Sequence, residues 1–448
     1  MTISTKQHNA IALITFCALL VFFRLNSAAF QPAESLIIFK ADLLVQFNGW
    51  LDLAPYSAPN GSFILPPMSI WLTAVIMKYV GNLPLHVRLL SAIFSAVSLV
   101  SIYQIARRVV GYQVALLAPV LLASTLLWND FARQVSPEIP AVMFTLVGFW
   151  SLIMLHERED MREKIGFALL YSLGIAGAFL SNFVAGGLTL MLVIPFLFSG
   201  KRSVGWMSMG IVVGLVPVVA WYSHVFSTVT SLGSPYSLSG IMSALGALLM
   251  NQPFAILGLI APILMLKVPK STTSKKSSAP ETALLVWFFG VVICSGWSNY
   301  STLLLLTPAA IILALRSFEL LASPQKARLA WIMVLSLVVA VFISMSVSGA
   351  EFMRMVFTGG ENALTVILFA GIALVFLAFG LLIPKTRMYL LTSRLMRWSG
   401  VVIPILLILR ILVANITKHS SIEHEETLRI PTEQHEEMNY QTSRAARA

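Results

Sequence analysis

Charged residues are scarce in this chain: Asp, Glu, Lys and Arg make up 11% of its 448 residues, whereas 58% of the residues are hydrophobic. A soluble globular domain draws about a quarter of its residues from these four types, so the chain lacks the polar surface that water requires. The same composition excludes intrinsic disorder, and unbroken rather than alternating apolar runs exclude an outer-membrane β-barrel. The sequence therefore predicts an all-α, polytopic membrane protein.

Cysteines and cofactor motifs are equally scarce. The two cysteines, Cys17 and Cys294, lie in apolar runs far apart in the chain, which excludes a disulfide framework. No GxGxxG, Walker, HExxH, GxSxG or CxxC pattern occurs in a supporting context, so soluble nucleotide chemistry is not expected. We predict no cofactor, and a divalent metal is left open because no ligand pattern indicates one.

The chain contains instead a series of apolar runs, which predict about 13 transmembrane helices. The runs cover roughly 10–23, 89–106, 113–129, 139–155, 165–181, 184–199, 205–225, 241–266, 283–297, 302–320, 329–347, 363–383 and 398–416. Most of the 30 Lys and Arg residues fall in alternate loops, which places the N-terminus in the cytoplasm and the C-terminus on the outer face. This bias explains the net charge of +11 without a nucleic-acid partner.

Two segments depart from the pattern of short loops. The first outer loop, residues 24–88, is too polar and broken to span a membrane, and its Trp50 and Trp71 favour short helices that lie in the headgroup region. The C-terminal segment 417–448 is polar and poor in aromatics, which predicts a disordered tail. We therefore expect one transmembrane domain over residues 1–416, followed by this tail.

Charged groups on the outer face are the first candidates for chemistry, because charges beside membrane spans are costly unless they are paired or used. Glu138 opens the span at 139–155 between Pro137 and Pro140; its carboxylate either caps that helix or serves a site with nearby Arg133. Arg88 opens the span at 89–106. Its guanidinium either reaches the headgroups or binds a lipid-linked phosphate in a bidentate manner.

In order and spacing, these features resemble the GT-C membrane glycosyltransferases of the protein O-mannosyltransferase and lipid A aminoarabinose transferase type. The matching segments are Gln31-Pro32-Ala33-Glu34, Asn48-Gly49-Trp50, Leu65-Pro66-Pro67-Met68 with Trp71, Arg88-Leu89-Leu90-Ser91-Ala92, Pro137-Glu138-Ile139-Pro140 and Ser181-Asn182-Phe183. The resemblance covers about residues 1–320 and is firmest over the first 160. It implies a GT-C-like fold in the plasma membrane or bacterial inner membrane.

The resemblance also implies an activity. Such an enzyme moves a hexosyl or pentosyl group from a polyprenyl-phosphate donor to a lipid, glycan or protein acceptor on the non-cytoplasmic face, with inversion at the anomeric carbon. Glu34 is then the catalytic base, and Glu138 positions the acceptor or the base. The implied substrate-binding residues are Arg88, Arg133, Pro66, Pro67, Trp71 and Asn182.

The chain departs from the family pattern at three positions. Ala33 stands where the family has its leading Asp, and Leu65 and Asn182 stand where it has Lys. The usual base and two contacts to the donor phosphate are thus absent, which keeps open a non-catalytic GT-C-like scaffold or binding subunit. A lipid or sugar transporter is a third possibility, disfavoured because the span interiors carry almost no charge.

Overall fold

The computed structural model describes residues 5–22, 25, 30, 32–47, 50, 66–199, 203–226, 279–295 and 301–321. Within these ranges every regular element is a helix: α1 (Thr5–Phe22), α2 (Pro32–Phe47), α3 (Pro67–Tyr79), α4 (Pro84–Val109), α5 (Tyr112–Ala115), α6 (Leu117–Ala123), α7 (Leu126–Ala132), α8 (Glu138–Glu157), α9 (Met161–Ser181), α10 (Phe183–Met191), α11 (Ile194–Leu197), α12 (Val204–Phe226), α15 (Ala279–Cys294) and α16 (Ser301–Leu321). The predicted all-α class is confirmed for this part of the chain.

Four of these helices, α4, α8, α9 and α12, are long and apolar enough to cross a membrane. They confirm the predicted spans at 89–106, 139–155, 165–181 and 205–225. Helices α1, α15 and α16 are shorter apolar helices at three further predicted positions. The predicted spans at 241–266, 329–347, 363–383 and 398–416 and the tail 417–448 lie outside the described residues, so the expected total stays a prediction.

Two predicted spans are interrupted in the structure. The run 113–129 is divided into α5, α6 and α7, whereas the run 184–199 is a shorter apolar helix, Phe183–Leu197, with a turn between α10 and α11. Each contains a proline, Pro119 or Pro195, which has no N–H to donate to the carbonyl four residues earlier. The first helix of each run ends at the residue that carries this carbonyl, Ala115 in α5 and Met191 in α10.

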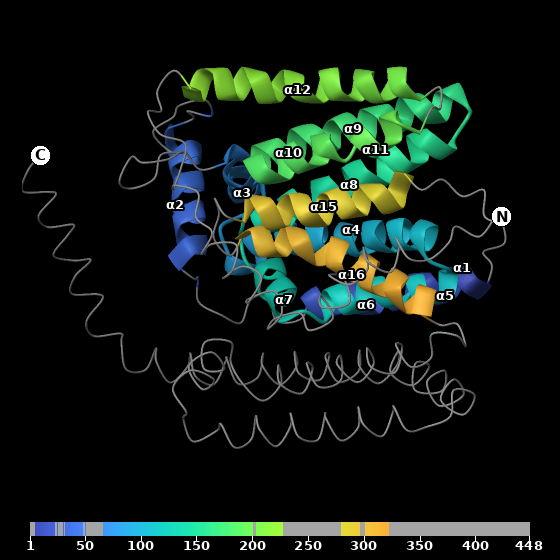
Figure 1. The fold of residues 1–448 in the computed structure, drawn as a ribbon. Helices are drawn as coiled ribbons and strands as arrows, with labels where there is room; N and C mark the ends of the chain where they lie inside the picture. Colours follow the sequence, from blue (N-terminus) through green and yellow to red (C-terminus); the bar gives the residue numbers. More distant parts are fainter. Residues whose placement is uncertain are drawn as a thin grey trace, which may run out of the picture.

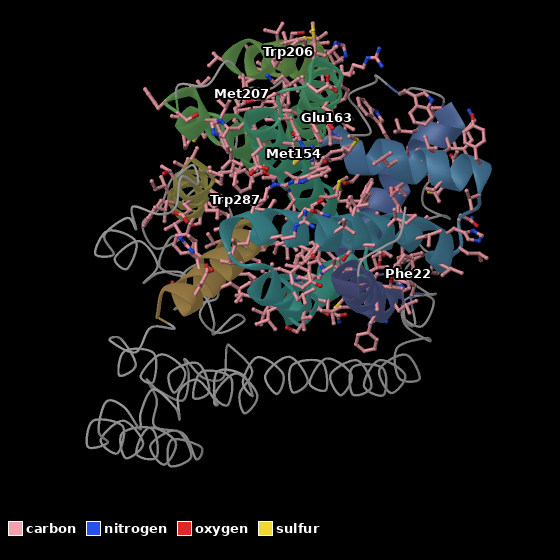
Figure 2. All side chains as sticks on the ribbon, turned by 90° about the vertical axis from the view of Figure 1, so that its right-hand side faces the viewer. Phe22, Met154, Glu163, Trp206, Met207 and Trp287 are labelled. Carbon is pink, nitrogen blue, oxygen red and sulfur yellow. The ribbon has the colours of Figure 1, made fainter. Side chains whose placement is uncertain are left out.

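Helices α4, α8, α9, α12 and α15 run side by side in a layered bundle (Figure 1). Helix α8 occupies its centre, with almost all of its residues buried inside the protein. Side chains fill the space between the helices around it (Figure 2). Trp287 of α15 is fully buried and packs edge-on against Phe149, with 5.8 Å between the ring centres. Its Nε1–H donates to the carbonyl of Leu305 at 2.8 Å.

Helices α8 and α9 approach each other closely where glycines face glycines. A Cβ added to Gly174 of α9 would lie 2.7 Å from the Cα of Gly148 and 3.0 Å from the carbonyl oxygen of Phe144, both in α8. Such contacts cannot be accommodated without separating the helices. Small residues therefore set the distance between the two helices, as is common in membrane proteins.

We expect Gly174→Ala to destabilise the protein by about 1–3 kcal/mol, the usual cost of overpacking a well-packed interior. Thermal unfolding of purified protein in lipid nanodiscs measures this. Gly166→Ala, in the same helix, is the matched control, because no atom lies within 4 Å of a Cβ added there and alanine favours helix. Equal unfolding temperatures for the two variants would contradict the close approach.

Among its described residues, the segment 24–88, predicted to be an outer loop with short helices, contains α2 and α3. Helix α2 lies crosswise over one end of the bundle, the end at which α4 and α8 begin and α9 finishes (Figure 1). We call this the α2 end. All eight candidate site residues belong to elements that meet there or to the turns between them.

Candidate active site

Helix α2 turns one face towards the bundle. Proline at its first position suits a helix start, and the buried positions Glu34, Ile37, Lys40, Ala41 and Leu44 follow one another at helical spacing. This spacing places them on a single helical face. Three of the five are apolar and anchor α2, so the carboxylate of Glu34 on the same face is buried with them.

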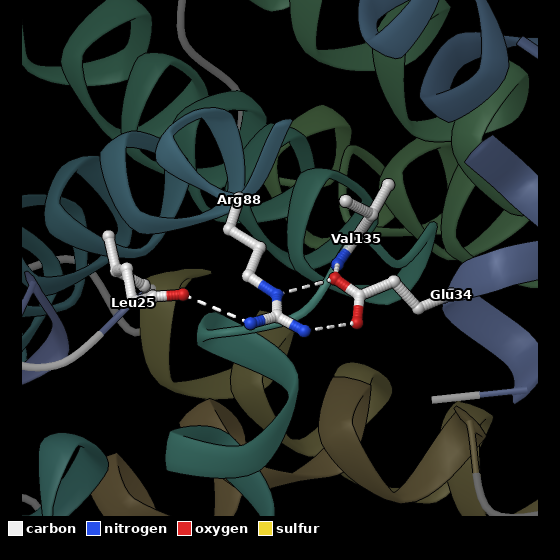
Figure 3. Close-up of polar contacts among 4 residues, drawn as sticks. All are labelled: Leu25, Glu34, Arg88 and Val135. Atoms are coloured by element: carbon white, nitrogen blue, oxygen red, sulfur yellow. Dashed lines mark hydrogen bonds and ion pairs between the residues drawn. The ribbon is translucent and has the colours of Figure 1, made fainter. Parts of the chain in front are cut away.

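Glu34 forms a bidentate ion pair with Arg88, near the start of α4 (Figure 3). Nε and Nη2 of Arg88 donate to Oε1 and Oε2 of Glu34 at 2.8 Å each. The two residues are only 1% and 3% exposed. Nη1 of Arg88 donates to the carbonyl of Leu25 at 3.0 Å, and the guanidinium carbon lies 5.1 Å from the centre of the Phe30 ring. The pair thus joins α2, α4 and the chain after α1.

The same carboxylate also holds the turn that precedes α8. The backbone N–H of Val135 donates to Oε1 of Glu34 at 3.0 Å (Figure 3). From the other side, the hydroxyl of Ser69 in α3 donates to the carbonyl of Ser136 at 3.3 Å. Glu138, the first residue of α8, follows two residues later. The structure therefore brings Glu34, Arg88 and the Glu138 turn together at the α2 end.

Arg133 and the α3 residues border this centre. Arg133 follows the last residue of α7, lies two residues before Val135, and is half-buried.

Pro66 directly precedes α3 and Pro67 is its first residue, a position that the fixed backbone angle of proline favours. Trp71 donates Nε1–H to the carbonyl of Trp50 at 3.1 Å, and its ring packs edge-on against Trp221 of α12 at 5.2 Å.

Asn182 lies at the junction of α9 and α10 and has a clear structural task. Its Oδ1 accepts hydrogen bonds from the backbone N–H groups of Val184 at 2.9 Å and Ala185 at 3.3 Å. This is an N-cap of α10, the position where asparagine is among the best residues. Because Oδ1 is used in this cap, a role of Asn182 in substrate binding would have to use its side-chain amide nitrogen.

Sequence reasoning missed the backbone groups that complete the centre. The Val135 N–H and the Leu25 carbonyl bind Glu34 and Arg88, and no side-chain pattern marks them. No sequence pattern singles out Lys40 either, although that side chain is buried on the inward face of α2. Among the described residues, no three His, Cys, Asp or Glu side chains form a group that could hold a metal ion.

Part of the chain is similar to a known protein family. Residues 65–224 match the model of the dolichyl-phosphate-mannose-protein mannosyltransferase family. This region includes all the candidate residues except Glu34. No curated protein sequence matches the chain.

Solved structures with a similar fold include ArnT from Cupriavidus metallidurans without ligand, at 18% identity and a TM-score of 0.56, covering 88% of this chain and 78% of ArnT. ArnT bound to undecaprenyl phosphate gives 17% identity and a TM-score of 0.53, with 87% and 77% covered. The arabinosyltransferase EmbB from Mycobacterium smegmatis gives 13% identity and a TM-score of 0.57, covering 93% of this chain and 42% of EmbB. At these identities the likeness establishes the fold.

Proposed function

Because the chain has the GT-C fold that its sequence resembles, we propose that it is a multi-pass membrane glycosyltransferase that takes a sugar from a polyprenyl-phosphate donor. The acceptor is a hydroxyl of a lipid, glycan or protein on the non-cytoplasmic face. The observation that carries the proposal is the meeting of Glu34, Arg88 and the Glu138 turn at one end of the bundle. This end is the outer one if the N-terminus is cytoplasmic, as in a bacterial inner-membrane protein.

The geometry supports a different division of roles between the two carboxylates from the one the resemblance implies. Oε1 of Glu34 already accepts two hydrogen bonds, and Oε2 accepts a third. To take a proton from an acceptor, Glu34 would have to leave Arg88 as a buried, unpaired charge, which costs several kcal/mol. We assign Glu34 to positioning: it fixes the turn before α8, and through that turn it fixes Glu138.

Glu138 is then the candidate base. In an inverting transfer its carboxylate accepts the hydroxyl proton as the acceptor oxygen forms a bond to the anomeric carbon. The bond from that carbon to the phosphate oxygen breaks, and the polyprenyl phosphate leaves with the electron pair. Cations near the phosphate oxygens stabilise the charge that develops there. Arg133 can provide one, whereas Arg88 already donates to Glu34 and Leu25.

The test is consumption of donor by the full chain in lipid nanodiscs. A panel of polyprenyl-phosphate sugars is incubated with the protein, and the released polyprenyl phosphate is quantified. We expect one donor to be consumed, while nucleotide sugars offered as controls are not. Binding of polyprenyl phosphate without consumption of any donor would favour the non-catalytic scaffold instead, to which the departures at Ala33 and Leu65 also point.

A further inference from the structure

The ion pair leaves the donor phosphate short of positive charge. Arg88 is committed to Glu34, and the family lysines are replaced by Leu65 and Asn182. A phosphate that departs with negative charge still requires cationic donors around it. A further lysine or arginine that faces the interior at the α2 end would meet this requirement.

Lys40 of α2 is such a residue. It lies three residues after Ile37, next to Ala41 and four residues before Leu44, and therefore on the inward face of the helix. Its side chain is largely buried, with 9% of the residue exposed. No hydrogen bond or ion pair joins its ammonium group to the residues that the structure describes. Asp42, the nearest acid in α2, accepts instead from Gln46 at 2.5 Å.

Burial without a partner is unfavourable for an ammonium group. Lys40 adjoins an apolar cluster, which we call the inner cluster, made of Ile37, Ala41, Leu44, Ile70, Ala74, Val87, Val135, Leu180 and Trp221. Leucine or methionine would pack in such surroundings at lower cost. The position of Lys40 is therefore explained if an anion from outside the chain completes its surroundings.

Two hydroxyl groups beside the same cluster also lack protein partners. Thr73 of α3 adjoins Ala74, and Ser181 at the end of α9 adjoins Leu180. They are 1% and 0% exposed, and neither side-chain oxygen makes a hydrogen bond within the described structure. Buried hydroxyls are normally hydrogen-bonded, and exceptions call for an explanation such as a bound ligand. The three helices α2, α3 and α9 all contribute to the inner cluster, and each carries one buried, unpaired polar side chain next in sequence to a member of that cluster.

We propose that Lys40, with the hydroxyls of Thr73 and Ser181, binds the phosphate of a polyprenyl phosphate, while the inner cluster contacts the prenyl chain. This inference rests on the proposed function and assigns the donor-phosphate site within it. A phosphate oxygen only accepts hydrogen bonds, whereas an ammonium group offers three donors and each hydroxyl one. A charge-assisted contact to phosphate satisfies Lys40 without any change in the protein's own hydrogen bonds.

The first test measures binding of undecaprenyl phosphate to purified protein in nanodiscs, with Lys40→Met against wild type. We expect the variant to bind about tenfold to a hundredfold more weakly, because it loses a hydrogen bond to a charged group, and Lys40→Arg to retain part of the affinity. Lys78→Met is the matched control, because Lys78 ends the neighbouring helix α3 with an exposed side chain. Equal affinities for Lys40→Met and Lys78→Met would overturn the proposal.

Two further ligands identify the source of the phosphate. Undecaprenol, which has the chain without the phosphate, should bind wild type and Lys40→Met alike. Inorganic phosphate should not compete at concentrations that saturate with the lipid. Competition by inorganic phosphate at equal concentration would show that the site recognises the free anion, which would overturn the lipid-linked assignment.

Thr73→Val separates a ligand contact from a structural role. Valine replaces a buried, unpartnered hydroxyl with a methyl group of similar shape, so the ligand-free protein should unfold at a higher temperature. The same variant should bind undecaprenyl phosphate about two- to tenfold more weakly. A stabilised variant with unchanged affinity would remove Thr73 from the site. If wild type binds the lipid and no variant changes binding, this inference fails while the proposed transfer activity stands.

Discussion

Arg88→Met is expected to destabilise the protein by about 3–5 kcal/mol, because it leaves the carboxylate of Glu34 buried without its partner. The affected ion pair is bidentate at 2.8 Å and almost fully shielded from water. Thermal unfolding in nanodiscs measures the loss. Arg158→Met is the matched control: its pair with Glu163 is 3.4 Å long and exposed on both sides, and such pairs contribute at most about 1 kcal/mol. Similar losses in both variants would contradict a buried pair.

The double variant Arg88→Met with Glu34→Leu distinguishes anchoring from chemistry. Removal of both charges leaves no buried unpaired charge, although the Val135 N–H and the Leu25 carbonyl each lose a partner, so we expect much of the lost stability to return. Sugar transfer is measured in the same preparation, alongside Glu34→Gln. Because the double variant no longer holds the turn before α8, we expect its transfer to stay low. Recovery of both stability and transfer in the double variant would contradict the positioning role of Glu34.

Glu138→Gln is expected to lower the rate of sugar transfer at saturating donor by about a hundredfold to ten-thousandfold, the usual contribution of a general base. Glutamine keeps the shape and hydrogen-bonding oxygen of the side chain but cannot accept the acceptor's proton. The folded state should therefore persist. Turnover of donor, measured together with the unfolding temperature, separates the two effects.

Glu163→Gln provides the control for this experiment. Glu163 lies in the first turn of α9, as Glu138 does in α8, so both substitutions remove one favourable charge from a helix N-terminus. Glu163 is exposed and lies at the opposite end of the bundle from the α2 end. Its replacement should leave transfer unchanged. If Glu138→Gln also keeps its rate within a few-fold of wild type, Glu138 is not the base.

Long helices were the part of the fold most accessible from the sequence. The runs behind α4, α8, α9 and α12 contain about twenty apolar residues each, which is enough to cross a bilayer, and the structure matches them within a few residues. The run 113–129 is equally apolar, yet it breaks near Pro119. Hydropathy does not register a missing backbone N–H, so composition alone overestimates the length of such helices.

The candidate site was predictable as a location but not as a set of contacts. Glu34 and Arg88 lie in the same predicted loop, 24–88, and are therefore assigned to one side of the membrane although 54 residues separate them. That they bind each other depends on how α2 is turned against the bundle, which is decided by packing of Ile37 and Leu44 with residues of distant helices. The buried position of Lys40 depends on the same packing, which the sequence does not reveal.

The breaks on either side of α6 restrict where this protein can open towards lipid. Helix α6 has seven residues, about 10 Å of length, and therefore cannot cross the hydrocarbon layer unaided. Ser124 and Thr125, which follow α6, donate their hydroxyls to the carbonyls of Leu121 and Leu122 at 2.9 Å each, but hydrocarbon offers no hydrogen-bond partner to other peptide groups freed at such breaks. Helices α1, α4 and α16, which contact α6, must therefore keep covering it. If the protein is the transferase proposed above, its long-chain donor enters from another flank.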